Sequence, residues 1–162
     1  SDGAVELAVN LMKNGRGFTI VTDTNMALAG VNKAALKQLN GTVRCFMADP
    51  DVAAEAKERG VTRAIVSMER AATLAGPVIF AIGNAPTALI RLYEMMQKGE
   101  IHPDFIIGTP VGFVNVVESK ELICQSSVPC IVARGRKGGS NIAAAVCNAL
   151  MYQVTRTQKS GK

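Results

Sequence analysis

The sequence predicts an α/β protein with an open, mostly parallel, doubly wound sheet that carries helices on both faces. Short apolar runs rich in Val, Ile and Phe alternate with longer segments of helical periodicity. In the second half of the chain the order is strand, helix, strand, helix, strand, helix, which is typical of parallel strands joined by crossover helices. The length of 162 residues fits one compact domain.

Each strand is expected where β-branched and aromatic residues cluster between turn residues. The expected strands are 18–22, 42–46, 77–82, 105–108 and 130–133. Helices are expected where apolar residues recur every three or four positions. The expected helices are 4–12, 31–39, 51–58, 62–75, 85–97, 116–123 and 141–153. We expect residues 1–154 to form a single domain and the basic segment 155–162 to be a flexible tail.

Composition and charge narrow the classes of function. No apolar run approaches the ~20 residues that cross a bilayer, so a soluble protein without a membrane partner is expected. The net charge of +5 favours anionic partners without choosing between nucleic acid, phosphate and a polycarboxylate. Because the chain has only two Tyr, five Phe and no strongly basic helix, we do not expect it to bind nucleic acid. The four cysteines lack CxxC spacing, which predicts free thiols in a reducing cytoplasm and no metal site.

Polar, glycine-rich loops follow four of the predicted strands. Their sequences are Thr-Asp-Thr-Asn-Met at 22–26, Gly-Asn-Ala-Pro-Thr at 83–87, Gly-Thr-Pro-Val-Gly-Phe at 108–113 and Arg-Gly-Arg-Lys-Gly-Gly-Ser-Asn at 134–141. In a doubly wound sheet, ligands bind outside the carboxyl ends of the strands. We therefore expect these loops to form one binding site.

The last of these loops carries three cations, Arg134, Arg136 and Lys137, among its glycines. Glycine lets backbone amides approach a ligand closely, and the cations can answer several negative charges at once. A solvated basic turn is the alternative, but such a turn does not need a Gly-Gly pair. Asn84 can cap the helix that begins near Pro86, or it can face an anion there.

The candidates for binding an anionic ligand come from three of the four loops. They are Thr22, Asp23, Asn25, Asn84, Thr87, Arg134, Gly135, Lys137, Gly138, Gly139 and Ser140. The only histidine, His102, precedes the fourth strand at its amino end and has no His or Cys partner nearby, so we do not expect it to be a general acid or a metal ligand. The chain has no GxSxG, GxGxxG or Gly-Lys-Ser/Thr phosphate-loop motif.

Taken together and in order, the loops resemble the precorrin-8X methylmutase family, also called precorrin isomerase. The matching segments are 23–26, 83–89, 108–114 with 118–120, and 134–140. The resemblance implies a flavodoxin-like sheet, a homodimer, and an isomerase of cobalamin biosynthesis that needs no cofactor and no protein-bound metal. Its reaction would convert precorrin-8X to hydrogenobyrinic acid, or cobalt-precorrin-8 to cobyrinic acid, by moving a methyl group within the molecule. The Asp-Thr-Asn-Met segment is more similar to the branch that acts on cobalt-precorrin-8.

The resemblance also implies a catalytic histidine that hydrogen-bonds or protonates a pyrrole-type nitrogen. The family places it upstream of Ser1, so the catalytic residue within this chain is unknown. Arg70 is a possible catalytic residue, and the alternative is that Arg70 is only an exposed charge on its helix. Three interpretations stay open. The chain is a shortened isomerase, a family member that binds corrinoid precursors without converting them, or an unrelated anion- or nucleotide-binding α/β domain.

Overall fold

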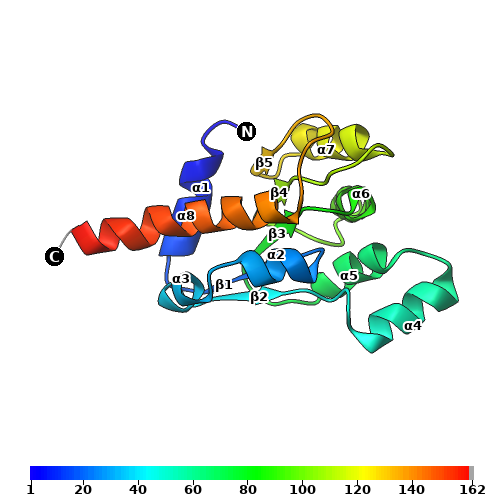
Figure 1. Cartoon of the computed structure of the whole chain (residues 1–162), viewed down its shortest axis with the longest axis horizontal. Helices are drawn as coiled ribbons and strands as arrows, with labels where there is room; N and C mark the ends of the chain where they lie inside the picture. Colours follow the sequence, from blue (N-terminus) through cyan, green and yellow to red (C-terminus); the bar gives the residue numbers. More distant parts are fainter. Residues whose placement is uncertain (161–162) are drawn as a thin grey trace.

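A computed structural model of the protein describes residues 1–160, and side chains as far as Arg156. Figure 1 shows a central sheet flanked by helices, with the long α8 crossing in front of it. The elements are α1 (Ala4–Lys13), β1 (Phe18–Thr22), α2 (Asn25–Gly30), α3 (Lys33–Gln38), β2 (Gly41–Arg44), α4 (Pro50–Arg59), α5 (Arg63–Ala71), β3 (Val78–Ile82), α6 (Pro86–Gln97), β4 (Phe105–Gly108), α7 (Val116–Gln125), β5 (Cys130–Val132) and α8 (Ser140–Ser160).

The strands of the described chain form one sheet in the order β2-β1-β3-β4-β5, and every neighbouring pair is parallel. This confirms the predicted open, doubly wound α/β fold. Because the strands are parallel, their carboxyl ends meet along one edge: Ile82 pairs with Gly108, and Gly108 pairs with Val132. We call this the carboxyl edge, and it carries the loops that follow β1, β3, β4 and β5.

Helices cover both faces of the sheet, as the continuous apolar runs of the central strands β3 and β4 require. In β3, Ile79 and Ala81 pack into the core beneath α1, α3 and α8, whereas Val78, Phe80 and Ile82 pack into the core beneath α4 to α7. All five side chains are buried. The two cores fix the sheet from both sides and so hold the carboxyl edge in place.

Three segments differ from the sequence-based prediction. Residues 25–30, expected to be loop, form the short helix α2, whose N-cap Thr24 accepts a hydrogen bond from the Ala27 amide at 3.1 Å. The helix expected over 62–75 ends at Ala71. Helix α8 continues to Ser160 and therefore includes most of the segment predicted as a tail, of which residues 161–162 lie outside the described part. No helix in the described part is long and apolar enough to cross a membrane.

Candidate functional site

Asp23 lies at the end of β1, and its carboxylate holds the loop that follows β3. The side chain is fully buried, and the backbone amides of three successive residues, Gly83, Asn84 and Ala85, donate to its two oxygens at 2.8, 2.8 and 2.6 Å. Burial raises the pKa of the Asp23 carboxyl, while the three amide hydrogen bonds oppose that rise. The structure therefore places this candidate inside the protein, where its oxygens serve the loop.

The amides of residues 83–85, which lead into α6, are consequently not open to a ligand. Asn84 does not cap α6 as the sequence suggested, because the N-cap position is Ala85 and no side chain caps it. The Asn84 side chain is exposed and makes no hydrogen bond within the described chain, so it is available to a ligand. Thr87 is half-buried, and its hydroxyl is hydrogen-bonded to that of Thr62 at 3.3 Å, which places the start of α5 beside the start of α6.

The remaining candidates at the end of β1 and in the loop after it include one buried and one exposed side chain. Thr22 is buried, and its hydroxyl donates to the carbonyls of Thr24 at 3.1 Å and Arg44 at 3.4 Å. Asn25 is exposed in the first turn of α2. Ser140, the first residue of α8, is hydrogen-bonded through its hydroxyl to that of Thr24 at 2.7 Å. The starts of α2 and α8 are thereby joined.

Glycines allow the loops of the carboxyl edge to lie against one another. A Cβ on Gly138 would stand 2.0 Å from the carbonyl oxygen of Thr109, and one on Gly83 would stand 2.6 Å from the Cα of Ser140. The Gly139 amide donates to the Thr109 carbonyl at 2.8 Å. The sequence predicted that Gly138 and Gly139 bring backbone to a ligand, and the structure shows in addition that the missing side chain of Gly138 lets two protein loops lie close together.

The cations of the last loop remain on the surface. We call residues 134–139 the cationic loop. Arg134 is 72% exposed along its side chain and pairs with Glu121 at 3.4 Å. Arg136 lies over the ring of Phe113, 5.7 Å from its centroid, and neither Arg136 nor Lys137 forms an ion pair with any residue that the structure describes. These two charges are open to an anionic ligand.

The first turn of α8 adds backbone donors next to the cationic loop. Within the described chain, the amides of Ser140 and Asn141 have no hydrogen-bond acceptor, whereas the amides of Ile142 and Ala143 already donate to the Gly139 carbonyl. Free amides at a helix start attract anions. Of these two amides only that of Asn141 belongs to an exposed residue, because Ser140 is buried against Gly83. Before α6, in contrast, the amides of residues 83–85 are occupied by Asp23.

Arg70 lies outside this arrangement. Its guanidinium pairs with Asp51, and with Glu55 at 3.5 Å, on the outer side of α4 and α5. The pairing with Asp51 raises the pKa of Arg70. His102 is exposed near the amino end of β4, in a hollow with Pro103. It therefore lies at the opposite end of the strands from the carboxyl edge. The structure brings neither residue to the other candidates.

Comparison with known proteins shows which family this chain resembles. The model of the precorrin-8X methylmutase family matches residues 1–153. The chain belongs to this family. It is 42% identical over 147 residues to a cobalt-precorrin-8 methylmutase of Priestia megaterium, covering 91% of this chain and 64% of the relative. It is 45% identical over 136 residues to one from Salmonella typhimurium, covering 83% and 63%. The chain thus spans slightly less than two thirds of the length of these relatives.

The likeness extends to solved structures. A precorrin-8X methylmutase from Thermus thermophilus superposes with a TM-score of 0.84 at 35% identity, covering 97% of this chain and 76% of the other. A protein described as related to precorrin-8X methylmutase superposes with a TM-score of 0.82 at 31% identity, covering 94% and 79%. Membership of the precorrin-8X methylmutase family excludes the third interpretation of the sequence, an unrelated anion-binding domain.

Three residues at or below this edge were not among the candidates named from the sequence, although Phe113 lies in one of the four loops and Lys120 in a segment that matches the family. Arg63 begins α5 beside Thr62, is exposed, and makes no ion pair within the described chain. Phe113 is 83% exposed beneath Arg136. Lys120 is fully buried below the cationic loop. Only Arg63 had a usable signal, a cation at the start of the helix expected over 62–75, since exposure and burial of the other two depend on the loop geometry.

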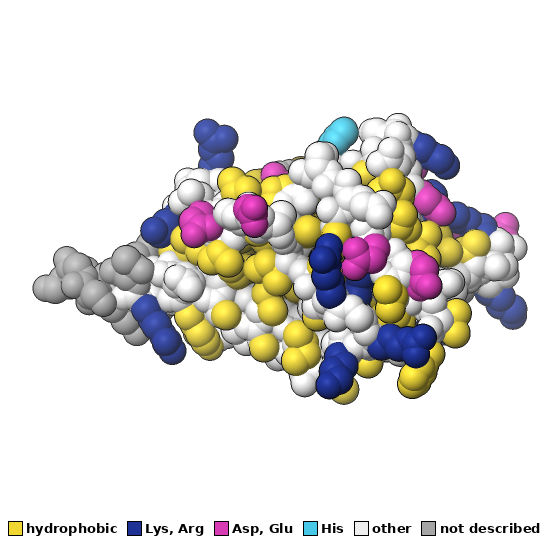
Figure 2. Space-filling model, turned by 90° about the horizontal axis from the view of Figure 1, so that it is seen from above, with side chains coloured by type: hydrophobic (Ala, Val, Ile, Leu, Met, Phe, Trp, Pro, Cys, Tyr) yellow, Lys and Arg dark blue, Asp and Glu magenta, His cyan; other side chains and the backbone are white. Residues whose placement is uncertain are grey.

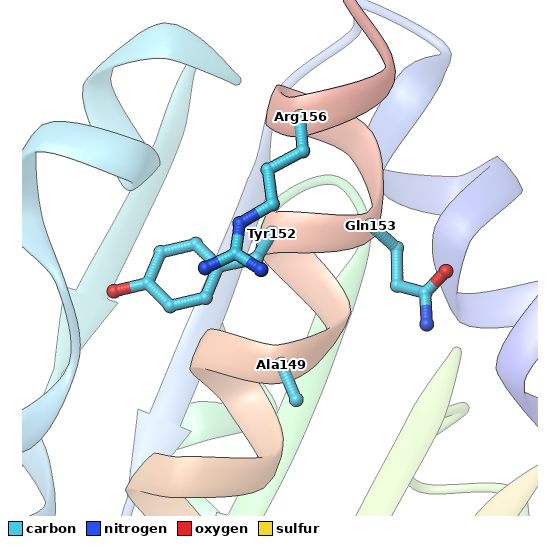
Figure 3. Close-up of a pocket in the computed structure, with 4 residues that line it drawn as sticks. All are labelled: Ala149, Tyr152, Gln153 and Arg156. Carbon is cyan, nitrogen blue, oxygen red and sulfur yellow. The ribbon is translucent and has the colours of Figure 1, made fainter.

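Two other surface features are a face of mixed charge and a hollow on α8. Figure 2 shows Lys and Arg mixed with Asp and Glu on one face, with hydrophobic side chains between them, so charge on that face is largely balanced. Figure 3 shows a hollow on α8, where the Arg156 guanidinium lies across the ring of Tyr152, 5.2 Å from its centroid, and Gln153 points to the other side of the helix. The hollow begins nine residues beyond Ser140, about 14 Å along the helix. The described residues contain no cluster of three or more His, Cys, Asp or Glu suited to a metal ion.

Proposed function

We propose that the carboxyl edge binds a polycarboxylate tetrapyrrole, precorrin-8X or cobalt-precorrin-8, and that this chain carries the substrate-binding part of an isomerase that moves a methyl group within that molecule. One observation supports the proposal above all. The exposed cations Arg136 and Lys137, which form no ion pair within the described chain, come shortly before the unpaired amide of the exposed Asn141 at the start of α8. Such donors suit carboxylates, which bind most strongly to charged partners.

The same edge also suits the body of a tetrapyrrole. Phe113 is 83% exposed, Val114 is 77% exposed, and both precede α7 on the loop that contacts the cationic loop. Met26 in the first turn of α2 is 71% exposed. A ligand with an apolar ring and a carboxylate rim can contact these side chains with its ring and the cations with its rim.

The reaction type limits what the protein must supply. A methyl shift within one molecule has no second reactant, so catalysis comes from holding the ring and stabilising charge as it redistributes. Arg136, Lys137 and the Asn141 amide can stabilise negative charge on the bound substrate, and Arg63 is a further cation of the same edge that forms no ion pair within the described chain. We propose that the proton donor implied by the family resemblance is outside this chain.

The cobalt content of the substrate is a finer part of the proposal. Relatives of both kinds are equally similar: the cobalt-precorrin-8 methylmutase of Salmonella typhimurium is 45% identical and the precorrin-8X methylmutase of Pseudomonas aeruginosa is 44% identical. The side chain of Asp23, in the segment that favoured the cobalt branch, is buried and cannot contact substrate cobalt. We propose that the site binds either form, and titration with cobyrinic acid and with hydrogenobyrinic acid compares the two.

Binding of hydrogenobyrinic acid, followed by absorbance, tests the proposal directly. Lys137→Ala is expected to weaken binding about tenfold to a hundredfold, because one charge-assisted contact contributes roughly 1.5–3 kcal/mol. Asn84→Ala is expected to weaken binding without lowering the melting temperature, since Asn84 caps no helix. Lys98→Ala, an exposed lysine at the other end of α6, is the control. Unchanged binding in both variants contradicts the site, and full isomerisation by this chain contradicts a proton donor outside it.

Two further properties belong to the same proposal. We propose a homodimer, supported by the exposed apolar side chains Val5 and Leu7 on α1. Sedimentation equilibrium tests it by looking for twice the chain mass of 17.1 kDa.

We also propose a cytoplasmic location, supported by the four free cysteines, since disulfides are rare in that compartment.

A further inference from the structure

A buried lysine lies directly beneath the cationic loop. Lys120 is in the middle of α7 and is 0% exposed. Its ammonium group donates to the carbonyl oxygens of Gly135 at 2.7 Å and Lys137 at 2.9 Å. These contacts join α7 to the backbone on both sides of Arg136.

The carbonyl between those two is held as well. The Gly112 amide donates to the Arg136 carbonyl at 3.3 Å, from the loop that precedes α7. Three successive carbonyls of the cationic loop therefore accept hydrogen bonds from α7 or from the segment leading into it. With its carbonyls turned inward, the loop keeps the side chains of Arg136 and Lys137 on the surface.

The charge of Lys120 has no counter-charge in the described chain. It forms no ion pair there, and the neighbouring Glu121 pairs with Arg134 at 3.4 Å. Burial lowers the pKa of Lys120. A buried cation that meets only carbonyls, below a loop with three more cations, is an unfavourable arrangement for the protein alone and is relieved by an anion bound on the loop.

We propose that Lys120 is a positioning residue of the tetrapyrrole site: it holds the cationic loop in its binding shape, and its charge is balanced by the substrate's carboxylates. The inference rests on the proposed function, because it needs the cationic loop to be the place where those carboxylates bind. Lys120 acts through Arg136 and Lys137 and does not itself touch the substrate.

The test compares Lys120→Met, Lys120→Arg and the control Lys98→Met, which removes the same charge from an exposed position. For each, the Kd for hydrogenobyrinic acid is measured at several salt concentrations, and melting is followed with and without ligand. Lys120→Met is expected to raise the Kd at least tenfold, to reduce the slope of log Kd against log salt, and to melt without ligand at or above the wild-type temperature. Lys120→Arg is expected to restore part of the affinity, and Lys98→Met to bind as the wild type does.

A merely structural lysine would give the opposite pattern, a lower melting temperature with unchanged Kd and salt slope, and that result overturns the proposal. If Lys120→Met does not fold, wild-type protein with isotope-labelled lysine decides by nuclear magnetic resonance. The Nζ signal of Lys120 is assigned as the one that the spectrum of Lys120→Arg lacks. This signal must shift when ligand is added to the wild type, and a signal that stays in place overturns the proposal. A wild type that does not bind the ligand overturns both proposals, whereas wild-type affinity in folded Lys120→Met overturns only this one.

Discussion

Asp23 illustrates how a single residue at the carboxyl edge can serve the site without touching the ligand. Its carboxylate accepts hydrogen bonds from the amides of residues 83–85 and so fixes the loop that presents Asn84. A carboxylate in such a buried position loses its hydration, and the three amide hydrogen bonds offset that loss. The anion at the start of α6 is thus the protein's own.

Asp23→Asn is expected to lower the free energy of unfolding by about 2–4 kcal/mol. The amide side chain keeps one oxygen but turns its NH2 group toward backbone N–H donors, which leaves buried donors without an acceptor. Urea unfolding followed by circular dichroism measures the change, with the exposed Asp2→Asn as control. Equal loss in both variants, or none in either, would contradict the role given to Asp23.

At the residue scale, the sequence predicted where polar groups gather but not what they contact. The position of Asp23 after a buried strand placed it correctly at the carboxyl edge. Whether its oxygens face a ligand or a neighbouring loop depends on how the loops after β1 and β3 meet, which no local pattern encodes. The sequence left Asn84 either as a cap or as an anion contact, and the cap does not form because the helix starts one residue later than its sequence signal suggests.

Among the elements, the loop after β5 depends most strongly on glycine. Gly138 and Gly135 lie in the same loop but in different surroundings: a Cβ on Gly138 would stand 2.0 Å from backbone, whereas a Cβ on Gly135 would have nothing within 4 Å. Gly135 has a φ of +79°, so a side chain there costs only backbone strain, typically about 1 kcal/mol.

The two glycines therefore make a matched pair of variants. Gly138→Ala is expected to destabilise the protein by at least about 2 kcal/mol more than Gly135→Ala, because backbone atoms have to move to admit the methyl group. Gly138→Ala is also expected to weaken binding of hydrogenobyrinic acid, since the cationic loop would be displaced. Chemical unfolding and ligand titration of both variants give the comparison, and equal effects would rule out the close packing as the cause.

Helices α4, α5 and α6 are linked by ion pairs that contribute pH-dependent stability. Glu69 on α5 pairs with Arg59 and with Arg91, the second at 2.8 Å. The hydrogen bond from Arg59, followed by the charges of Arg59 and Arg91, lowers the pKa of Glu69 below its ordinary value of 4.5. A carboxyl whose folded pKa is lowered stabilises the protein above its unfolded pKa and loses that effect as the pH falls through the folded value.

Glu69→Gln is accordingly expected to be less stable than the wild type at neutral pH, by about 1 kcal/mol or less. The difference should disappear in acid, once Glu69 is protonated in both the folded and unfolded wild type. Urea midpoints across the acid range measure it, and Glu58→Gln, an exposed glutamate of α4 without an ion pair in the described chain, is the control. A difference that persists in acid would show that Glu69 acts by packing.

Element prediction succeeded where the pattern was strong and local. The runs at 18–22 and 105–108 became β1 and β4 with the predicted bounds, because β-branched and aromatic residues between turns favour a buried strand. Helix α2 was missed because six residues ending in Gly30 carry no helical period, and its stability comes from the Thr24 cap and from packing on α8. The length of α8 was underestimated because its last turns are polar.

At the scale of the whole molecule, the sheet separates its only histidine from the binding edge. His102 precedes β4, so it lies at the amino end of the strands, and the proposed site lies at the carboxyl end. His102→Ala is expected to leave both the binding of hydrogenobyrinic acid and the rate of the substrate-to-product absorbance change as in the wild type. Loss of either would mean that His102 reaches the substrate.

The contacts between the edge loops restrict how this site can be altered by exchange of parts. Gly138 rests on Thr109, Gly83 on Ser140, and Ser140 on Thr24, so four loops from four strands share one packed arrangement. In a chimera that takes only its cationic loop from a relative, the side chains of the new loop would pack against the three unchanged loops of this protein. Exchange of substrate preference between family members is therefore expected to require all four loops as a block, and directed evolution of one loop alone should mostly yield unstable proteins.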